Sequence, residues 1–311
     1  MSLAILASLP TVLLELKRAK MDRGFTYEEL RTQIEDAIQE LIDDGAWSGF
    51  LEFACNFATY SPRNTILIYN QCKRRGIVPS YVAGYHRWRQ LGRWVKRGER
   101  GVRIVVPVLS RRPSERIAVE TTHVAEEISV VGFKNAYVFD LSQTEGDELV
   151  VPLSPVSLLG SGNDEVEKYL KTQLDSKGFQ VVLNDLERGV NGFTDFSQMV
   201  VAISNSLSDR QRLKTLSHEY AHAVLHETKA IDRELAELQA ETFAYLMMTS
   251  LGMETAQYSI PYILRWANGS PDRALDGFEI AYELFIDVHS ALVATCSALG
   301  CSHVALHDVV A

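Results

Sequence analysis

Apolar residues recur every three to four positions in two stretches near the start of the chain. The first, Thr26–Asp44, places four apolar side chains on one side of a helix, at Leu30, Ile34, Ile38 and Leu41. The second predicted helix covers Arg63–Arg74, because Ser61 can cap it and Pro62 suits its first position. Short strands are then predicted at three places, Val102–Val108, Ala118–Thr122 and Ala136–Phe139.

The second half of the chain begins with a helix at Glu165–Ser176 and a strand at Phe179–Asn184. The pair Asn191-Gly192 predicts a hairpin turn leading into a strand at Gln198–Ser204. From Ser208 onward the pattern is mostly helical. Helices and strands that are not arranged as repeated βαβ units favour an α+β fold class.

The length of 311 residues is about twice that of a common domain, which favours two domains. A stretch rich in Pro, Ser and Gly, residues 151–164, marks the boundary between them. We therefore expect an N-terminal extension (1–20), a first domain (21–150), this linker (151–164) and a second domain (165–311).

The composition, 46% apolar and 23% charged, is that of a globular protein and excludes wholesale disorder. The first apolar stretch, Leu3–Leu14, is interrupted by Pro10 and is too short to span a bilayer. The four cysteines form no CxxC pair, which favours reduced thiols. We expect a cytoplasmic protein with no membrane partner.

Charge is distributed unevenly along the chain. Residues 1–152 carry 20 Lys+Arg against 19 Asp+Glu, and residues 153–311 carry 11 against 21. Within the first half, residues 60–116 hold 14 basic and 2 acidic side chains, an excess of 12 positive charges. Such a local excess is typical of a phosphate-binding surface, although a solvated basic face without a ligand has the same composition.

The strongest chemical pattern is the run from His218 through Glu219 to His222. Ser208 and Gln211 form a capping box that starts a helix, on which two histidines four positions apart project from one face. Both imidazoles can therefore bind one zinc ion. Glu219 is placed to hydrogen-bond a water on the metal, which is the general-base position of a zinc hydrolase.

A catalytic zinc ion requires a third protein ligand. The next helix, capped by Asp232, places Glu237 and Glu241 on one face, 15 and 19 residues after His222. We expect Glu237 to be the third ligand, with Glu241 accepting the other N–H of a ligating histidine. Glu234 and Glu241 remain alternative ligands, because one sequence does not determine the phase of the helix.

This site resembles the zincin metallopeptidases of the glutamate-ligand type, and the run Thr215–His226 resembles their ImmA/IrrE-like branch. The resemblance implies a zincin-like fold for the second domain and zinc-dependent hydrolysis of a protein or peptide. It also implies that the strand Gln198–Ser204 lies at the edge of a sheet, where an extended peptide can pair with it. Tyr262 is a candidate oxyanion donor.

Aromatic and cationic residues alternate within the basic segment, as single-stranded nucleic acid requires for stacking on bases and binding to phosphates. Packing of the individual rings in a core is the alternative. The candidate DNA-binding residues are Tyr60, Arg63, Asn64, Arg87, Trp88, Arg93, Lys96, Arg97, Arg100 and Arg103.

Residues 25–110 resemble the N-terminal single-stranded-DNA-binding domain of ArdC-type antirestriction proteins. The resemblance rests on Tyr60, Ser61, Asn64, Gly84, Trp88, Leu91, Gly92, Lys96, Gly98, Glu99 and Gly101. It implies an α+β DNA-binding domain followed by a zincin, and protection of the DNA of a mobile element from restriction.

Two other functions agree with the sequence. The protein could mask DNA with a metal that is not catalytic, or it could be an ImmA/IrrE-like protease that cleaves a regulator.

Overall fold

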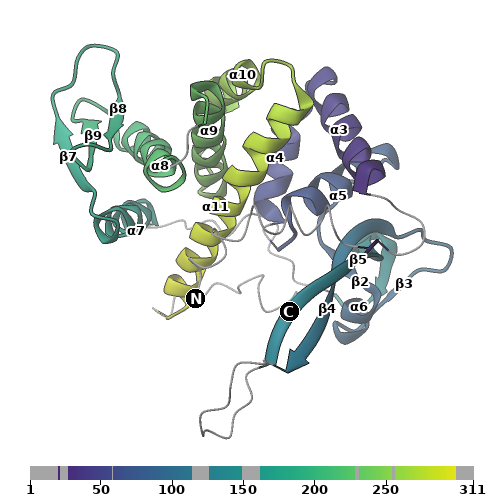
Figure 1. The fold of residues 1–311 in the computed structure, drawn as a ribbon. Coiled ribbons are helices and arrows are strands. Elements are labelled where there is room, and N and C mark those ends of the chain that lie inside the picture. The colour runs from purple at the N-terminus through teal and green to yellow at the C-terminus, as the bar shows by residue number, and fades with distance from the viewer. Residues whose placement is uncertain are drawn as a thin grey trace, which may run out of the picture. The chain divides into compact units, whose positions relative to one another are not determined.

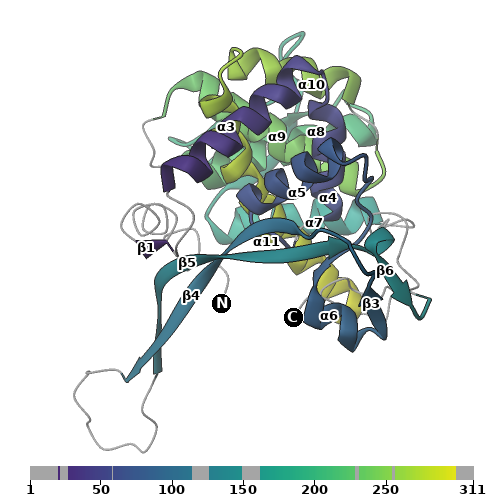
Figure 2. The ribbon, with the colours of Figure 1, turned by 90° about the vertical axis from the view of Figure 1, so that its right-hand side faces the viewer.

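The computed structural model describes residues 20–21, 27–57, 59–113, 126–148, 162–227, 231–253 and 256–298 (Figures 1 and 2). They contain both helices and sheets, so the predicted α+β class is confirmed. Three predicted segments lie wholly or mostly outside the described residues: the strand Ala118–Thr122, the extension 1–20 and the linker 151–164. Among the described helices, none has the length and apolar character that crossing a bilayer requires.

The chain divides into two compact units, and residues 35–69 belong with the C-terminal part of the chain. The first unit combines Met1–Ile34 with Asn70–Leu149, and the second combines Glu35–Tyr69 with Val150–Ala311. The division at 151–164 stays a prediction.

The elements up to residue 146 are, in chain order, β1 (Lys20–Met21), α3 (Tyr27–Asp43), α4 (Trp47–Asn56), α5 (Pro62–Arg74), β2 (Val82–Gly84), α6 (Tyr85–Gln90), β3 (Arg93–Val95), β4 (Val102–Pro113), β5 (Glu126–Asp140), η1 (Leu141–Gln143) and β6 (Thr144–Gly146). The helices predicted at Thr26–Asp44 and Arg63–Arg74 are confirmed as α3 and α5. The predicted strands Val102–Val108 and Ala136–Phe139 are confirmed as parts of β4 and β5.

The sheet of the first unit is built on β5, which pairs with β1, β2 and β4. β4 and β5 form a long antiparallel ladder, from Val102 opposite Val138 to Pro113 opposite Glu126 (Figure 2). Trp88 of α6 is fully buried in this unit, and its indole Nε1 donates to the carbonyl of Phe139 at 3.0 Å. A separate two-stranded sheet pairs β3 with β6.

The second unit continues with α7 (Gly162–Ser176), β7 (Gln180–Asn184), β8 (Gly192–Asp195), β9 (Val200–Ser204), α8 (Asp209–Leu225), α9 (Arg233–Ser250), α10 (Ala256–Ala267) and α11 (Pro271–Ala298). The predicted caps are both formed, because Ser208 accepts from the Gln211 N–H and Asp232 accepts from the Leu235 N–H. Both helices therefore begin where the sequence predicts.

The hairpin of this unit differs from the prediction. Gly192 is the first residue of β8, and the turn lies between β8 and β9, where Met199 has a positive φ of 54°. Gly192 serves close approach instead of a turn: a Cβ there would lie 2.7 Å from Cγ2 of Thr215 and 2.9 Å from the carbonyl oxygen of Ala202. Packing of β8 against α8 therefore explains this glycine.

The prediction that Gln198–Ser204 forms an edge strand is also wrong. The sheet order is β7-β9-β8, so β9 is central, pairing with β7 in parallel and with β8 antiparallel. In the described part of the chain, β8 pairs only with β9 and forms one edge of the sheet. The error arises because β7 joins the other side of β9 through a parallel pairing that local sequence signals do not reveal.

Helix α11 packs along α9, and α4 also contacts α9 (Figure 1). Phe50 and Phe278 join α4 to α11 with ring centroids 4.9 Å apart. The buried hydroxyl of Tyr282 lies 3.0 Å and 2.9 Å from the carbonyl oxygens of Ala54 and Phe57, at the end of α4. These contacts explain why residues 35–69 belong to the second unit.

We predict that the close packing of α11 against α9 requires a glycine at position 277. A Cβ at this position would lie 2.5 Å from Cγ and Cδ2 of Leu238. Overpacking costs about 1–3 kcal/mol, whereas alanine gains about 0.5–1 kcal/mol over glycine within a helix. We expect Gly277→Ala to lower the free energy of unfolding by roughly 1–2 kcal/mol, measured by chemical denaturation.

The control is the same substitution in a Leu238→Ala background, which removes the clashing atoms. There, Gly277→Ala should be neutral or stabilising. Equal destabilisation in both backgrounds would contradict this interpretation.

Candidate metal centre

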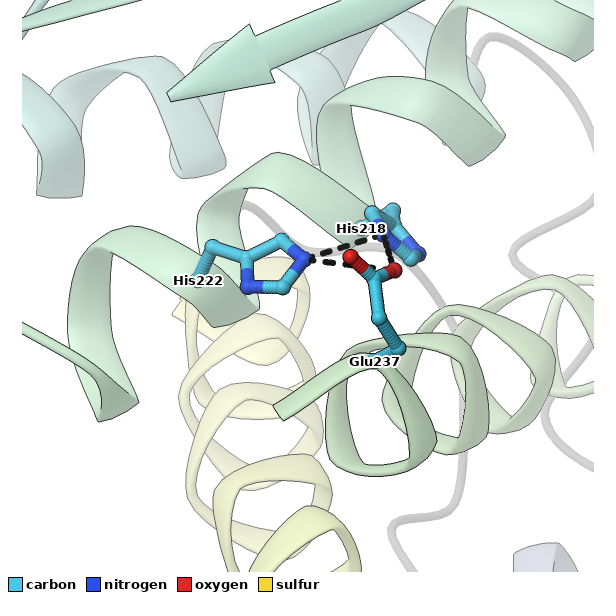
Figure 3. Close-up of side chains that lie close together, drawn as sticks. All are labelled: His218, His222 and Glu237. Carbon is cyan, nitrogen blue, oxygen red and sulfur yellow. Dashed lines mark hydrogen bonds and ion pairs between the residues drawn. The ribbon is translucent and has the colours of Figure 1, made fainter. Parts of the chain in front are cut away.

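Helices α8 and α9 bring the predicted ligands together. Figure 3 shows His218 and His222 projecting from one helix toward Glu237 on the other. The two histidine Nε2 atoms are 3.1 Å apart, and Oε2 of Glu237 lies 3.4 Å from Nε2 of His218 and 3.8 Å from Nε2 of His222. Within the described residues, these three form the cluster whose ligand atoms lie within 4.8 Å of one another.

These distances fit a metal ion. In a tetrahedral site with bonds of about 2.0–2.1 Å, neighbouring ligand atoms are separated by about 3.3 Å. The three observed separations lie close to this value, so the residues can hold a divalent cation with small adjustments of their side chains. Two imidazoles and one carboxylate form a ligand set found in catalytic zinc sites.

The electrostatics of the cluster also favour a cation. Burial lowers the pKa of His218, but hydrogen bonds with Glu237 and Glu241 outweigh burial and raise the pKa to about 9. The hydrogen bonds with His218 and His222 hold the pKa of Glu237 far below its usual range. The carboxylate is therefore ionised at neutral pH, and a metal would replace the positive charge that a proton supplies in its absence.

Glu241 lies behind His218. Its Oε2 is 3.3 Å from Nδ1 of His218, the ring nitrogen that faces away from the cluster, and its Oε1 is 2.8 Å from Nζ of Lys214. Burial raises the pKa of Glu241, but His218 and Lys214 overcome this effect and hold the pKa at about 2. The third glutamate considered, Glu234, pairs instead with Arg273 at 3.2 Å.

Glu219 is buried and is held by a residue from the sheet. The hydroxyl of Thr194, on β8, lies 2.9 Å from Oε2 of Glu219 and 3.2 Å from its backbone carbonyl oxygen. Nothing in the sequence pattern indicates Thr194, because its proximity to Glu219 depends on the approach of β8 to α8. Tyr262 lies on α10 with its side chain 53% exposed, and the contacts of the cluster described above come from α8, α9 and β8.

His226 lies outside the three-residue cluster and contacts one of its members. Its Nδ1 lies 2.9 Å from Nδ1 of His222, and its Nε2 lies 3.0 Å from Oε1 of the buried Gln239. The sequence contains a signal for this contact, since His226 follows His222 by four residues on the same helix.

The candidate DNA-binding residues are divided between the two units. Tyr60, Arg63 and Asn64 belong to the second unit, where Arg63 forms an ion pair with Glu279 and Asn64 is buried. The other seven belong to the first unit. Because Trp88 is fully buried there, its ring is not available to stack on a base.

Several of the remaining cations hydrogen-bond to neighbouring groups. Arg93 donates to Thr144, Lys96 to the carbonyl of Ser142, and Arg103 to Gln33. Arg87 donates to Gln90. Arg97 and Arg100 are exposed, on a turn where Gly98 has a positive φ of 92°.

That turn is held from inside by Gln143. Its buried side-chain amide donates to Oε2 of Glu99 at 2.8 Å and to the carbonyl of Arg100 at 3.0 Å. The one acidic side chain of the turn is thereby engaged by an internal donor. Next to the turn, Gly101 lies so close to Tyr137 that a Cβ there would be 2.9 Å from the Tyr137 Cβ. The Tyr137 ring is 58% exposed and was missed in the sequence analysis.

Comparison with known proteins identifies two domains. Residues 26–139 match the family model of the N-terminal domain of the anti-restriction factor ArdC, and residues 174–284 match that of the IrrE N-terminal-like domain, a peptidase family. An uncharacterised protein of Bacillus anthracis is 23% identical over 296 residues, which cover 79% of this chain and 49% of that protein. The chain thus spans about half the length of this curated relative.

The fold is similar to that of a solved protein. The metal-free crystal structure of the antirestriction protein ArdC from plasmid R388 has a TM-score of 0.52 and 18% identity, covering 85% of this chain and 97% of that one. Its Mn(II)-bound crystal structure has a TM-score of 0.53 and 17% identity, with the same coverage. Residues 26–139 thus match the ArdC N-terminal domain family and residues 174–284 the IrrE-like domain family, and the order of these domains together with the fold supports an ArdC-type antirestriction protein.

Proposed function

We propose that this protein protects DNA from restriction by binding single-stranded DNA through its N-terminal domain, and that its C-terminal domain is a metal-dependent peptidase. The observation that carries the peptidase proposal is the convergence of His218, His222 and Glu237 on a volume that one divalent ion can fill. The Mn(II)-bound structure of the plasmid R388 protein supports a divalent metal here, and the ligand set favours zinc.

When bound, such a metal supplies Lewis-acid chemistry, which activates water and polarises the scissile carbonyl. Glu219 acts as the general base: it takes a proton from the attacking water as the oxygen adds to the carbonyl carbon. The C–N bond then breaks, and Glu219 passes the proton to the departing amine nitrogen. Among the described strands, the edge of β8 that faces away from β9 has no strand paired with it, and it supports an extended peptide as the substrate because such an edge can pair with peptide backbone.

Glu219→Gln is expected to abolish peptide cleavage while the metal stays bound. The amide cannot accept the proton, so the rate should fall by at least about 100-fold. The measurements are cleavage of a quenched-fluorescent peptide library and metal content by mass spectrometry, with His218→Ala as the variant that loses the metal.

A Glu219→Gln protein that cleaves as well as the wild type would remove the general-base assignment. Unchanged DNA protection by this variant would assign the metal a role outside catalysis. Peptide cleavage without DNA binding at moderate salt would favour a regulator-cleaving protease.

Thr194 is proposed to hold the general base in position. Its hydroxyl has one proton, and the charged Oε2 of Glu219 is the closer of its two acceptors. With Oε2 engaged in this way, Oε1 is the oxygen that remains to take the proton from water.

Thr194→Val keeps the side-chain shape and removes the donor. We expect kcat to fall about 10–100-fold, since hydrogen bonds to charged groups are worth about 1.5–3 kcal/mol. KM and metal content should not change. The matched control is Thr194→Ser, which keeps the hydroxyl and should retain most of the activity; an equal loss in both variants would contradict the positioning role.

For DNA binding we propose the turn that carries Arg97 and Arg100, together with the exposed ring of Tyr137. Both guanidinium groups are exposed, and Glu99 between them is engaged by Gln143. Tyr137 lies beside the turn and can stack on a base while the arginines bind phosphates.

Two kinds of variant separate these contributions in fluorescence anisotropy with a labelled single-stranded oligonucleotide. The double variant Arg97→Ala/Arg100→Ala should lower the slope of log affinity against log salt by about 1.4, at about 0.7 for each phosphate contact. Tyr137→Ala should weaken binding at every salt concentration by about 1–3 kcal/mol with an unchanged slope.

Lys168→Ala is the control, because it removes an exposed positive charge from the second unit. An effect of Lys168→Ala equal to that of the arginine variant would indicate that overall charge, and not this turn, determines the affinity.

A further inference from the structure

His222 is supported by two successive side-chain contacts, to His226 and from there to Gln239, which are separate from the contacts behind His218. His226 is the C-cap residue of α8, one turn after His222, and its Nδ1 lies 2.9 Å from Nδ1 of His222. On the other side of the His226 ring, Nε2 lies 3.0 Å from Oε1 of Gln239. Gln239 is only 5% exposed and comes from α9, two residues after Glu237.

The chemistry of the groups indicates the direction of the hydrogen bonds in these two contacts. An amide oxygen can only accept, so Nε2 of His226 carries the proton. A His222 that binds a metal through Nε2 carries its ring proton on Nδ1, and Nδ1 of His226, 2.9 Å away, is placed to accept that proton in a hydrogen bond. The lone pair of His222 is therefore at Nε2, the atom that faces Nε2 of His218 at 3.1 Å and Oε2 of Glu237 at 3.8 Å.

We propose that His226 and Gln239 are positioning residues that hold His222 in the tautomer and ring orientation needed to bind a divalent metal ion through Nε2. This inference rests on the metal site of the proposed function, and it does not depend on peptide cleavage. His226 is not itself a ligand, because it contacts Nδ1, on the side of the His222 ring opposite the candidate metal.

The two histidines are therefore supported by different chemistry. His218 donates from Nδ1 to a carboxylate, Glu241, whose charge is balanced by Lys214. His222 contacts the imidazole of His226, which in turn contacts the amide of Gln239. The tautomer of His222 is thus selected through an imidazole and an amide, whereas that of His218 is selected through a carboxylate.

The test is the affinity of the full-length protein for Zn²⁺ and Mn²⁺, measured by competition with a chromogenic chelator. His226→Phe removes the acceptor for His222 and should weaken metal binding about 10–100-fold. His226→Gln supplies an amide oxygen and an amide N–H in place of the ring, so it should recover part of the affinity. His86→Phe, which removes an exposed histidine of the first unit, should have no effect.

Gln239→Leu should also weaken binding, and combining it with His226→Phe should add little, because Gln239 acts on His222 only through His226. Nitrogen-15 NMR of the zinc-loaded wild type should show Nδ1–H on His222. Variants that bind metal as tightly as the wild type, or zinc-bound His222 with its proton on Nε2, would overturn the proposal.

Failure of the proposed peptidase would look different. Loss of metal affinity in the variants, in a protein that cleaves no peptide, supports the positioning role and rejects the catalytic one. A wild-type protein that binds neither metal would overturn both.

Discussion

Two imidazole nitrogens and a carboxylate oxygen held within 4.8 Å of one another need a positive charge between them, and the C-terminal unit is organised around that requirement. The lone pairs of two Nε2 atoms at 3.1 Å would repel each other without a shared cation. What keeps the groups together is the packing of α8 against α9. Helix α9 is buried at every residue from Leu238 to Met248, so burial on all of its sides fixes this helix in the unit and holds Glu237, just before that stretch, against α8.

Around this cluster, each candidate side chain on α8 is supported by residues of α8, α9 or β8. Glu241 and Lys214 fix His218, His226 and Gln239 fix His222, and Thr194 holds Glu219. A metal site needs such outer contacts because an imidazole can ligate through either nitrogen, and only a hydrogen bond to one nitrogen selects the other. The side chain of Thr194 is short, so its hydroxyl reaches Glu219 only because β8 lies close to α8. Gly192, two residues earlier on β8, allows this close approach of the two elements.

The basic segment illustrates how positive charge in a sequence differs from positive charge available to a ligand. Arg63 is neutralised by Glu279, and Arg93, Lys96 and Arg103 hydrogen-bond to nearby carbonyl or side-chain oxygens of their own unit. Arg97 and Arg100 are exposed on a turn whose one acidic residue, Glu99, accepts a hydrogen bond from Gln143. The proposed DNA binding then depends on a small part of the charge excess that the sequence displays.

By itself the sequence determined the α+β class, the helices that carry the candidate metal ligands, and the residues that converge there. Those features are local: helix periodicity places His218 one turn from His222, and the caps at Ser208 and Asp232 start both helices at the right residue. The choice among Glu234, Glu237 and Glu241 was open, since it depends on how α9 is rotated against α8. Only the tertiary structure decided it in favour of Glu237 facing both histidines, with Glu241 behind His218. The same holds for the central place of β9, the burial of Trp88, and the contacts of Thr194, Gln239 and Tyr137. Each depends on contacts between segments distant in sequence, which hydrophobic patterns and turn signals do not encode.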